Sequence, residues 1–264
     1  MPFVTATDGA RLYYEVTGAG TPLLLIAGQA QDRAQWAGVR DDFAAHHHVI
    51  VFDHRGTGDS DKPAQPAYST RGFANDAIAI LDALGVARAH VYGTSMGGRV
   101  GQWLAIEHAA RVGALILGCT TPGDAHGVAR SPEVSAALAS GDPARLLPHL
   151  VSPEWAATHQ AFLRNVTMEL LSRPVPPHAR RLHYQASEAH DAWDQLPSIT
   201  APTLIVHGSA DQVNLPANAQ LLAQRIPGAE LHIIPGGRHA YHWEYRPGAS
   251  DLVLAFLARY PITA

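Results

Sequence analysis

A single serine stands between glycines in the stretch "HVYGTSMGGRVGQWLA", residues 90–105. The segment Gly93-Thr94-Ser95-Met96-Gly97 fits the pattern G-x-S-x-G, with an apolar run before it and a helical pattern after it. Small residues two positions before and two after the serine let a strand and a helix approach closely at a sharp bend. The bend predicts an exposed Ser95 hydroxyl beside the free N–H groups of the first helical turn, which suits a nucleophile. The competing interpretation is a glycine-lined turn in which Ser95 only caps the helix.

A serine hydroxyl is barely ionised at neutral pH, so it needs a base to accept its proton and a carboxylate to orient that base. In a sheet with this bend, the acid and the base are expected on loops after later strands, in the order Ser, Asp or Glu, His. Asp211 lies three residues after the apolar run "TLIVHG", and His239 follows the run "LHIIPG" on a glycine-rich loop. We therefore predict a catalytic triad of Ser95, His239 and Asp211.

Three other residues compete for these roles. His242 is the rival base, because it lies on the same loop as His239. Asp124 is the alternative acid, since some sheets of this kind place the acid after the strand predicted at 114–118. His207 lies at the end of a predicted strand, and we expect it to pack in the core.

The charge that develops on a carbonyl oxygen under attack needs hydrogen-bond donors, which together lower the barrier by several kcal/mol. The first predicted donor is the backbone N–H of Met96, the residue after the nucleophile. The second is the backbone N–H of Gln29, in the loop that follows the apolar run "PLLLIAG". The alternative is that this loop merely connects a strand to a helix.

Short apolar runs alternate along the chain with helical patterns. Because continuous apolar runs are typical of strands buried on both faces, this alternation predicts an α/β fold with a mostly parallel central sheet and helices on both faces. Residues 11–16 alternate in polarity and predict an exposed antiparallel strand. Buried strands are predicted at 22–28, 48–53, 90–93, 114–118, 201–208 and 229–236, and helices at 71–85, 96–110, 218–226 and 250–260.

The alternation stops between residues 122 and 197. This segment is rich in Pro, His, Arg and Ala, and it has helical stretches at 131–140 and 154–172 but no strand pattern. We predict a helical cap or lid over 122–197, inserted into one core domain formed by 1–121 and 198–264. An insertion of this kind is expected to cover the site.

Composition limits the possible partners and compartments. The 264 residues carry a formal net charge of -4, which does not favour binding to nucleic acid or anionic membranes. Cys119 is the only cysteine, so an internal disulfide or a cysteine zinc site is excluded. The start resembles no signal peptide and no apolar run approaches the roughly 20 residues of a membrane span, so we expect a cytoplasmic protein. The predicted chemistry needs no metal, nucleotide or flavin cofactor.

These motifs resemble those of the α/β-hydrolase superfamily over nearly the whole chain. The stretch "VFDHRGTGDSDKP" resembles its D-x-R-G-x-G-x-S loop, "GTSMGG" its nucleophile turn, "HGSADQVNLP" its acid loop and "GGRHA" its histidine loop. Residues 93–123 are most similar to 3-oxoadipate enol-lactonases and related small lactone and ester hydrolases. Two positions depart from that pattern. Ala27-Gly28 replaces the usual His-Gly, and Arg99 replaces an apolar residue, where we expect a helix-surface ion pair rather than a contact with a substrate carboxylate.

The resemblance and the predicted triad both imply a serine hydrolase that cleaves an ester or lactone of a small molecule through an acyl-enzyme. The same triad also serves cofactor-free perhydrolases or haloperoxidases and C–C bond hydrolases, and the scaffold can serve as a slow-turnover ligand receptor. The sequence alone does not choose among these reactions.

Overall fold

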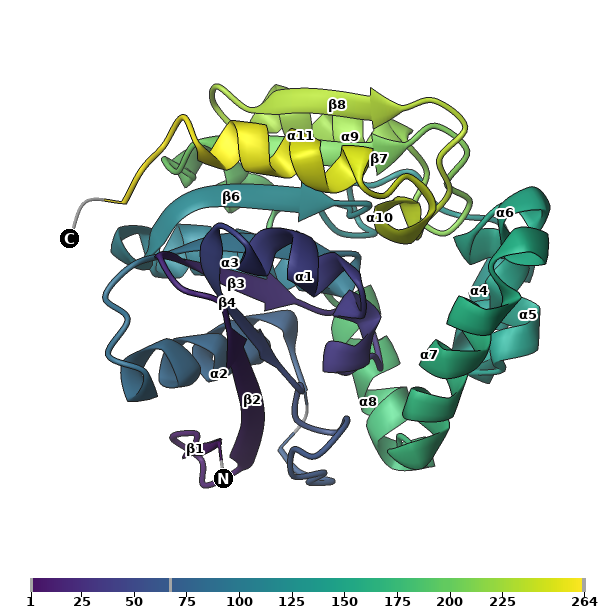
Figure 1. The fold of residues 1–264 in the computed structure, drawn as a ribbon, viewed down its shortest axis with the longest axis horizontal. Helices are drawn as coiled ribbons and strands as arrows, with labels where there is room; N and C mark the ends of the chain where they lie inside the picture. Colours follow the sequence, from purple (N-terminus) through teal and green to yellow (C-terminus); the bar gives the residue numbers. More distant parts are fainter. Residues whose placement is uncertain (1, 67, 263–264) are drawn as a thin grey trace.

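The computed structural model describes residues 2–66 and 68–262. Within them, eight strands form one sheet in the order β1-β2-β4-β3-β5-β6-β7-β8 (Figure 1). Strands β1 and β2 pair antiparallel, β2 pairs antiparallel with β4, and the other neighbours are parallel. The strands are β1 Phe3–Thr5, β2 Arg11–Thr17, β3 Thr21–Ile26, β4 His47–Phe52, β5 Ala89–Thr94, β6 Val112–Gly118, β7 Thr203–Gly208 and β8 Glu230–Ile234.

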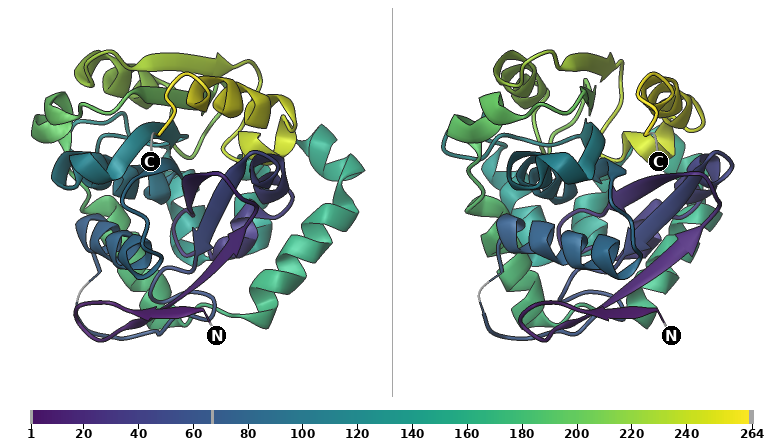
Figure 2. Two further views of the ribbon diagram at one scale, coloured as in Figure 1. Left: turned by 60° about the vertical axis from the view of Figure 1, so that its left-hand side comes forward. Right: turned by 90° about the vertical axis from the view of Figure 1, so that its left-hand side faces the viewer.

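Helices cover both faces of the sheet, as Figure 2 shows. Alternate residues of the parallel strands enter two cores; in β3, for example, Leu24 and Ile26 enter one and Leu23 and Leu25 the other. The first core is completed by helices α2 (Thr70–Ala83), α3 (Met96–Glu107) and α9 (Ala217–Arg225), and the second by α1 (Val39–Ala44) and α11 (Gly248–Leu257). The predicted fold class is confirmed. The short elements η1 (Arg33–Trp36), η2 (Ala109–Arg111) and α10 (Tyr241–Glu244) lie in connections.

Between β6 and β7 the chain forms helices and no sheet strand within the described residues. We call residues 122–197 the cap segment. Its helices lie beyond the ends toward which the β6 and β8 arrows point (Figure 1). The elements that begin in this segment are α4 Pro132–Ser140, α5 Pro143–Leu150, α6 Pro153–Thr158, α7 Gln160–Ser172, α8 Pro177–Glu188 and η3 Trp193–Ser198, the last of which ends one residue beyond it.

Local sequence explains how these cap helices begin. Ser131, Asp142 and Ser152 each accept a backbone N–H of the following turn, and a proline follows each of them at the first helical position. The prediction of one helical stretch over 154–172 was wrong at one point, because α6 ends and α7 begins around His159. The Thr158 hydroxyl donates to the carbonyls of Glu154 and Trp155 there, and such side-chain bonds compete with the regular helix ladder.

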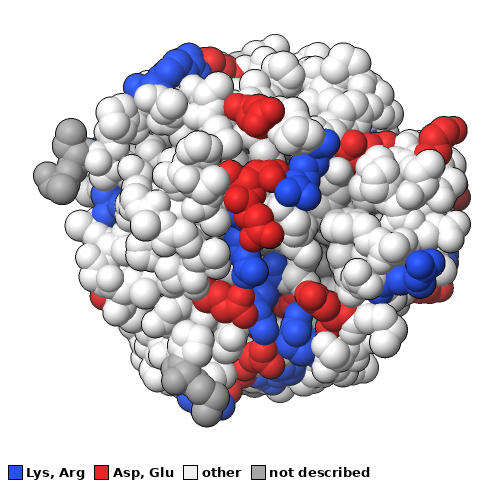
Figure 3. Space-filling view, viewed as in Figure 1, with Lys and Arg blue, Asp and Glu red and all other residues white. Residues whose placement is uncertain are grey.

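Charged side chains of both signs lie next to one another in a band on the face shown in Figure 3. The ion pairs of the molecule include Arg33 with Glu15 at 2.7 Å and Arg246 with Asp42 at 2.7 Å. Opposite charges therefore neutralise each other locally rather than forming one large patch of a single sign on this face. Among the described residues, no helix has the length and apolar character needed to cross a bilayer.

Candidate active site

Ser95 lies in the tight turn between β5 and α3. Its backbone angles are φ 55 and ψ -119, a left-handed conformation that costs a residue with a side chain about 1 kcal/mol or more. The end of β6 holds this turn, because the Ser95 N–H donates to Gly118 O at 2.9 Å and the Thr120 hydroxyl donates to Ser95 O at 2.7 Å. The strained turn is thus fixed from the neighbouring strand.

The glycines on either side of Ser95 are required by close backbone contacts. A Cβ atom on Gly93 would lie 2.1 Å from Gly97 O, and one on Gly97 would lie 2.1 Å from Ile26 O. These are backbone atoms, so the clash could be relieved only by moving the strand or the helix. The spacing in the sequence motif therefore has a direct steric cause.

Replacement of Gly97 by alanine is expected to lower thermal stability, because α3 and the end of β3 must move apart to admit the methyl group. Overpacking of this kind typically costs about 1–3 kcal/mol. The matched control is Gly248→Ala at the start of α11, since a Cβ there has no neighbour within 4 Å and Gly248 lacks a positive φ. Thermal unfolding of both variants measures the effect. Equal behaviour of the two variants would contradict the steric account.

His239 and Asp211 are joined by a hydrogen bond of 2.8 Å between His239 Nδ1 and Asp211 Oδ2. Asp211 is buried, and it also accepts the backbone N–H groups of Val213 at 2.8 Å and Asn214 at 3.0 Å. Burial alone would raise the pKa of Asp211, but His239 and His207 outweigh it and lower this pKa to about 2. Because the ionised carboxylate can only accept, the His239 Nδ1 carries the hydrogen and Nε2 is left with a lone pair when the ring is neutral.

The acid loop and the serine turn are anchored to the same strand end. Asn214 Nδ2 donates to Cys119 O at 2.6 Å. Cys119 lies between Gly118 and Thr120, the two residues that form hydrogen bonds with the Ser95 backbone. Among the described residues, however, no hydrogen bond joins Ser95 Oγ to His239 Nε2. The structure therefore brings together two of the three predicted triad residues by a direct contact and places Ser95 on a turn tied to the same strand end.

The loop after β3 runs beside Ser95. A Cβ on Gly28 would lie 3.5 Å from the Ser95 Cβ. The Gly28 N–H donates to Gln35 Oε1 at 2.7 Å, and Gln35 Nε2 donates to Thr94 Oγ1 at 2.6 Å, so one buried amide ties this loop to the end of β5. In the parts of the chain that the structure describes, the Gln29 N–H has no hydrogen-bond acceptor.

Sequence reasoning did not identify Gln35. It belongs to η1, a single turn of 3-10 helix, and its side chain bridges residues that are 7 and 59 positions away. No local motif marks such a residue, because its role depends on two segments meeting in the folded chain.

The rival site residues have other partners. His242 is buried between Trp36 and Trp243, its ring nitrogens have no hydrogen-bond partner among the described residues, and burial lowers its pKa to about 3. Asp124 is 3.4 Å from Arg99, and neither a hydrogen bond nor an ion pair joins it to His239. The core position expected for His207 is confirmed, but its Nε2 also donates to Asn214 O at 2.7 Å and lies 3.2 Å from Asp211 Oδ2.

Arg99 does not form the surface ion pair that we expected. Its side chain is only 2% exposed, and it donates to the backbone carbonyl and the hydroxyl of Ser187 at the end of α8. Asp124 is its ionic partner, at 3.4 Å. The apolar residue expected at this position is thus replaced by a buried guanidinium that ties α3 to the cap segment.

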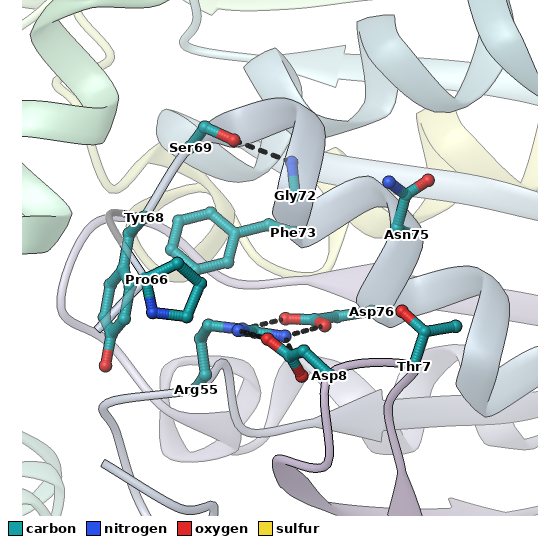
Figure 4. A pocket seen from close by; sticks show the side chains of 10 residues that line it. All are labelled: Thr7, Asp8, Arg55, Pro66, Tyr68, Ser69, Gly72, Phe73, Asn75 and Asp76. Atoms are coloured by element: carbon teal, nitrogen blue, oxygen red, sulfur yellow. Dashed lines mark hydrogen bonds and ion pairs between the residues drawn. The ribbon is translucent and has the colours of Figure 1, made fainter. Parts of the chain in front are cut away.

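Two cavities of about 160 Å³ are lined by none of the three predicted triad residues. One is beside Arg55, between the β1–β2 turn and α2, and Figure 4 shows its lining residues. The other lies between the cap segment and the acid loop, where Asp124, Arg130 and Glu188 face Val213 and Asn214. Neither cavity is lined by Ser95 or His239, so neither one identifies the substrate pocket.

Comparison with known families gives a match over most of the chain. Residues 21–245 match the family model described as the alpha/beta hydrolase fold. A protein of Azorhizobium caulinodans named "Putative carbamate hydrolase RutD" is 34% identical over 268 residues, which cover 97% of this chain and 98% of that protein.

Solved structures also match almost the whole chain. Est816, described as an N-acyl homoserine lactone degrading enzyme, is 35% identical with a TM-score of 0.81, and the match covers 96% of this chain and 99% of that one. The enol-lactonase of Burkholderia xenovorans has a TM-score of 0.87 at 23% identity, covering 97% of this chain and 100% of the other. At that identity the likeness concerns the fold alone.

Proposed function

Because the chain belongs to the alpha/beta hydrolase family, we propose that it is a serine hydrolase that cleaves a carboxylic ester or lactone of a small molecule. The observation that carries this proposal is the combination of a strained serine turn at the end of β5 with a buried His239–Asp211 pair bonded at 2.8 Å. A left-handed serine is costly and persists where the surrounding structure imposes it, and such strain is concentrated at functional sites. The likeness to a lactone-degrading enzyme at 35% identity supports the substrate class.

In the proposed reaction, Ser95 Oγ attacks the carbonyl carbon of the substrate while His239 Nε2 accepts the hydroxyl proton. Asp211 holds the ring so that Nε2 is the basic nitrogen, and it stabilises the imidazolium that forms. The tetrahedral intermediate then expels the alcohol, which takes the proton from Nε2 as the C–O bond breaks. The acyl group remains on Ser95.

Water completes the cycle by the same route. His239 Nε2 accepts a proton from the water that attacks the acyl carbon, and it returns this proton to Ser95 Oγ when the ester bond to the serine breaks. In a lactone the alcohol and the acid belong to one molecule, so a single hydroxy acid is released. None of these steps requires a metal ion or an organic cofactor.

The oxyanion of each tetrahedral intermediate would be held by the N–H groups of Met96 and Gln29. Met96 follows the nucleophile at the start of α3, and the loop that carries Gln29 runs beside Ser95. We further propose that residues 122–197 form a cap over a core of 1–121 and 198–264, and that the substrate binds between them. The buried bonds from Arg99 to Ser187 support this arrangement by joining the two parts.

The proposal is tested by labelling and hydrolysis together. A fluorophosphonate probe is expected to add one phosphonyl group to Ser95, found by peptide mass spectrometry. The unlabelled protein is expected to hydrolyse p-nitrophenyl acetate or an N-acyl homoserine lactone with release of one acid equivalent per turnover, and complete labelling is expected to abolish that hydrolysis. Peroxide-dependent halogenation without ester or lactone hydrolysis would overturn the proposal in favour of a perhydrolase. Labelling of another residue would overturn the assignment of the nucleophile.

A further inference from the structure

We propose that His183, on α8 of the cap segment, is a positioning residue for the oxyanion loop, which we define as residues 27–30. This inference rests on the proposed function, because it assigns to the cap segment the task of holding the Gln29 N–H in place. His183 does not touch the reacting atoms. It acts through the backbone of Ala30.

Both nitrogens of the His183 ring are used in contacts with the core domain. The Nε2 atom is 2.9 Å from the Arg55 carbonyl oxygen, and the Nδ1 atom is 3.3 Å from the Ala30 backbone nitrogen. A carbonyl oxygen can only accept, so Nε2 carries the hydrogen and Nδ1 accepts the Ala30 N–H. The ring is completely buried, so water does not compete for either contact. His183 therefore connects two loops that are 25 residues apart in the sequence and fixes their separation.

The oxyanion loop needs such a contact because its backbone is strained. Ala30 has φ 54, a left-handed conformation that a residue with a Cβ atom disfavours. The loop is also held before Gln29, where His54 Nε2 donates to Ala27 O at 3.0 Å and the Gly28 N–H donates to Gln35. The contact of His183 with Ala30 lies on the far side of Gln29, where the Gln31 N–H also donates to Gly28 O at 3.3 Å. Together these bonds fix both ends of the peptide whose N–H is proposed to face the oxyanion.

His183 can hold the oxyanion loop because Arg55, whose carbonyl oxygen it contacts, is itself held in place. The Arg55 guanidinium donates to both carboxylate oxygens of Asp76, at 2.7 and 2.6 Å, and it also pairs with Asp8 (Figure 4). The ring of His183 stacks on Phe73, with centroids 5.0 Å apart and planes at 25°. The position of the ring is thus set by α2 and by the loop after β4. Any displacement of α8 would withdraw Nδ1 from Ala30, which couples the cap segment to the proposed oxyanion site.

Three substitutions separate the two contacts of His183. His183→Phe keeps the ring and its stacking but removes both nitrogens. In His183→Asn the side-chain oxygen reaches about as far as Nδ1 of histidine, so it can accept the Ala30 N–H. In His183→Gln the side-chain nitrogen reaches about as far as Nε2 of histidine, so it can donate to Arg55 O. We expect kcat for ester or lactone hydrolysis to fall about 10- to 100-fold in the Phe and Gln variants, with KM changed less than about 3-fold. The Asn variant should stay within about 5-fold of the natural protein.

The matched control is His178→Phe, on the same helix. His178 Nε2 is 3.0 Å from Lys62 O, so this change also removes a bond from α8 to the loop after β4 but leaves Ala30 untouched. Its kcat is expected to stay within about 2-fold of the natural protein. Equal losses in the Asn, Gln and Phe variants, or a natural kcat in His183→Phe, would overturn the positioning role. These outcomes are distinct from failure of the proposed function, which would appear as unchanged hydrolysis in Ser95→Ala.

Discussion

Replacement of Ser95 by alanine is expected to lower kcat for ester or lactone hydrolysis by a factor of about 10⁴ to 10⁶. The change removes the only atom that the proposed mechanism joins covalently to the substrate. The remaining hydrogen-bond donors and the His239–Asp211 pair could then only assist direct attack by water, which is far slower. Steady-state hydrolysis measured with highly purified protein tests this, with phosphonate titration to count active sites. Activity above about 1% of the natural value would show that Ser95 is not the nucleophile.

The same position offers a control on folding. Alanine keeps the Cβ of Ser95 and hence the same backbone strain at φ 55, so the unfolding free energy of Ser95→Ala should match that of the natural protein. Glycine has no Cβ and adopts this conformation readily, so Ser95→Gly should be more stable by about 1 kcal/mol while being equally inactive. Urea unfolding of the three proteins separates lost chemistry from lost structure. A less stable glycine variant would contradict the assignment of strain to this turn.

The sheet could be predicted from the sequence because its strands are buried on both faces. Each of β3, β4, β5, β6 and β7 contributes residues to at least one of the two cores and therefore appears as an almost continuous apolar run. The serine turn was predictable for a related reason, since Gly93 and Gly97 are required by backbone contacts that any chain with this bend must make. Asp211 and His239 could be located because they directly follow such strands. In each case the pattern that allows the prediction lies within a few neighbouring residues of the sequence.

Other features depend on contacts between distant segments and left no local signal. The strand β1 is 3 residues long and the helix α1 is 6, so each contains fewer than two periods of its pattern. His183 contacts Ala30 across 153 positions and Arg55 across 128, and the pattern of α8 alone gives no reason to distinguish this histidine from the others. The buried role of Arg99 was missed because an arginine on a helix is ordinarily exposed. These roles become visible only when the cap segment is seen against the core.

Buried histidines with lowered pKa values predict a strong acid sensitivity of the fold. Burial lowers the pKa of His54 to about 4 and that of His183 and His242 to about 3, against an ordinary value of 6.5. Below pH 6.5 each of these side chains gains a proton in the unfolded chain but not in the folded one, so their contribution to stability is complete above pH 6.5 and is lost as the pH falls toward 4 and 3. Asp211, with a pKa of about 2, remains ionised over this interval and does not oppose the loss.

The expected result is a free energy of unfolding that falls by several kcal/mol between pH 7 and pH 5, since each histidine contributes up to about 1.4 kcal/mol per pH unit. This is a large share of the about 5–15 kcal/mol that stabilises a typical domain. Urea unfolding at half-unit pH steps measures this free energy.

His242→Phe should lower the slope of the unfolding free energy against pH by about one proton. Phenylalanine keeps the packing against Trp36 and Trp243, and no hydrogen bond of His242 to the described residues is lost. His232→Gln, at an exposed position on β8, should leave the slope unchanged. Stability that is constant from pH 7 to pH 5 would mean that these rings take up protons in the folded protein as readily as in the unfolded chain, which would contradict the lowered pKa values.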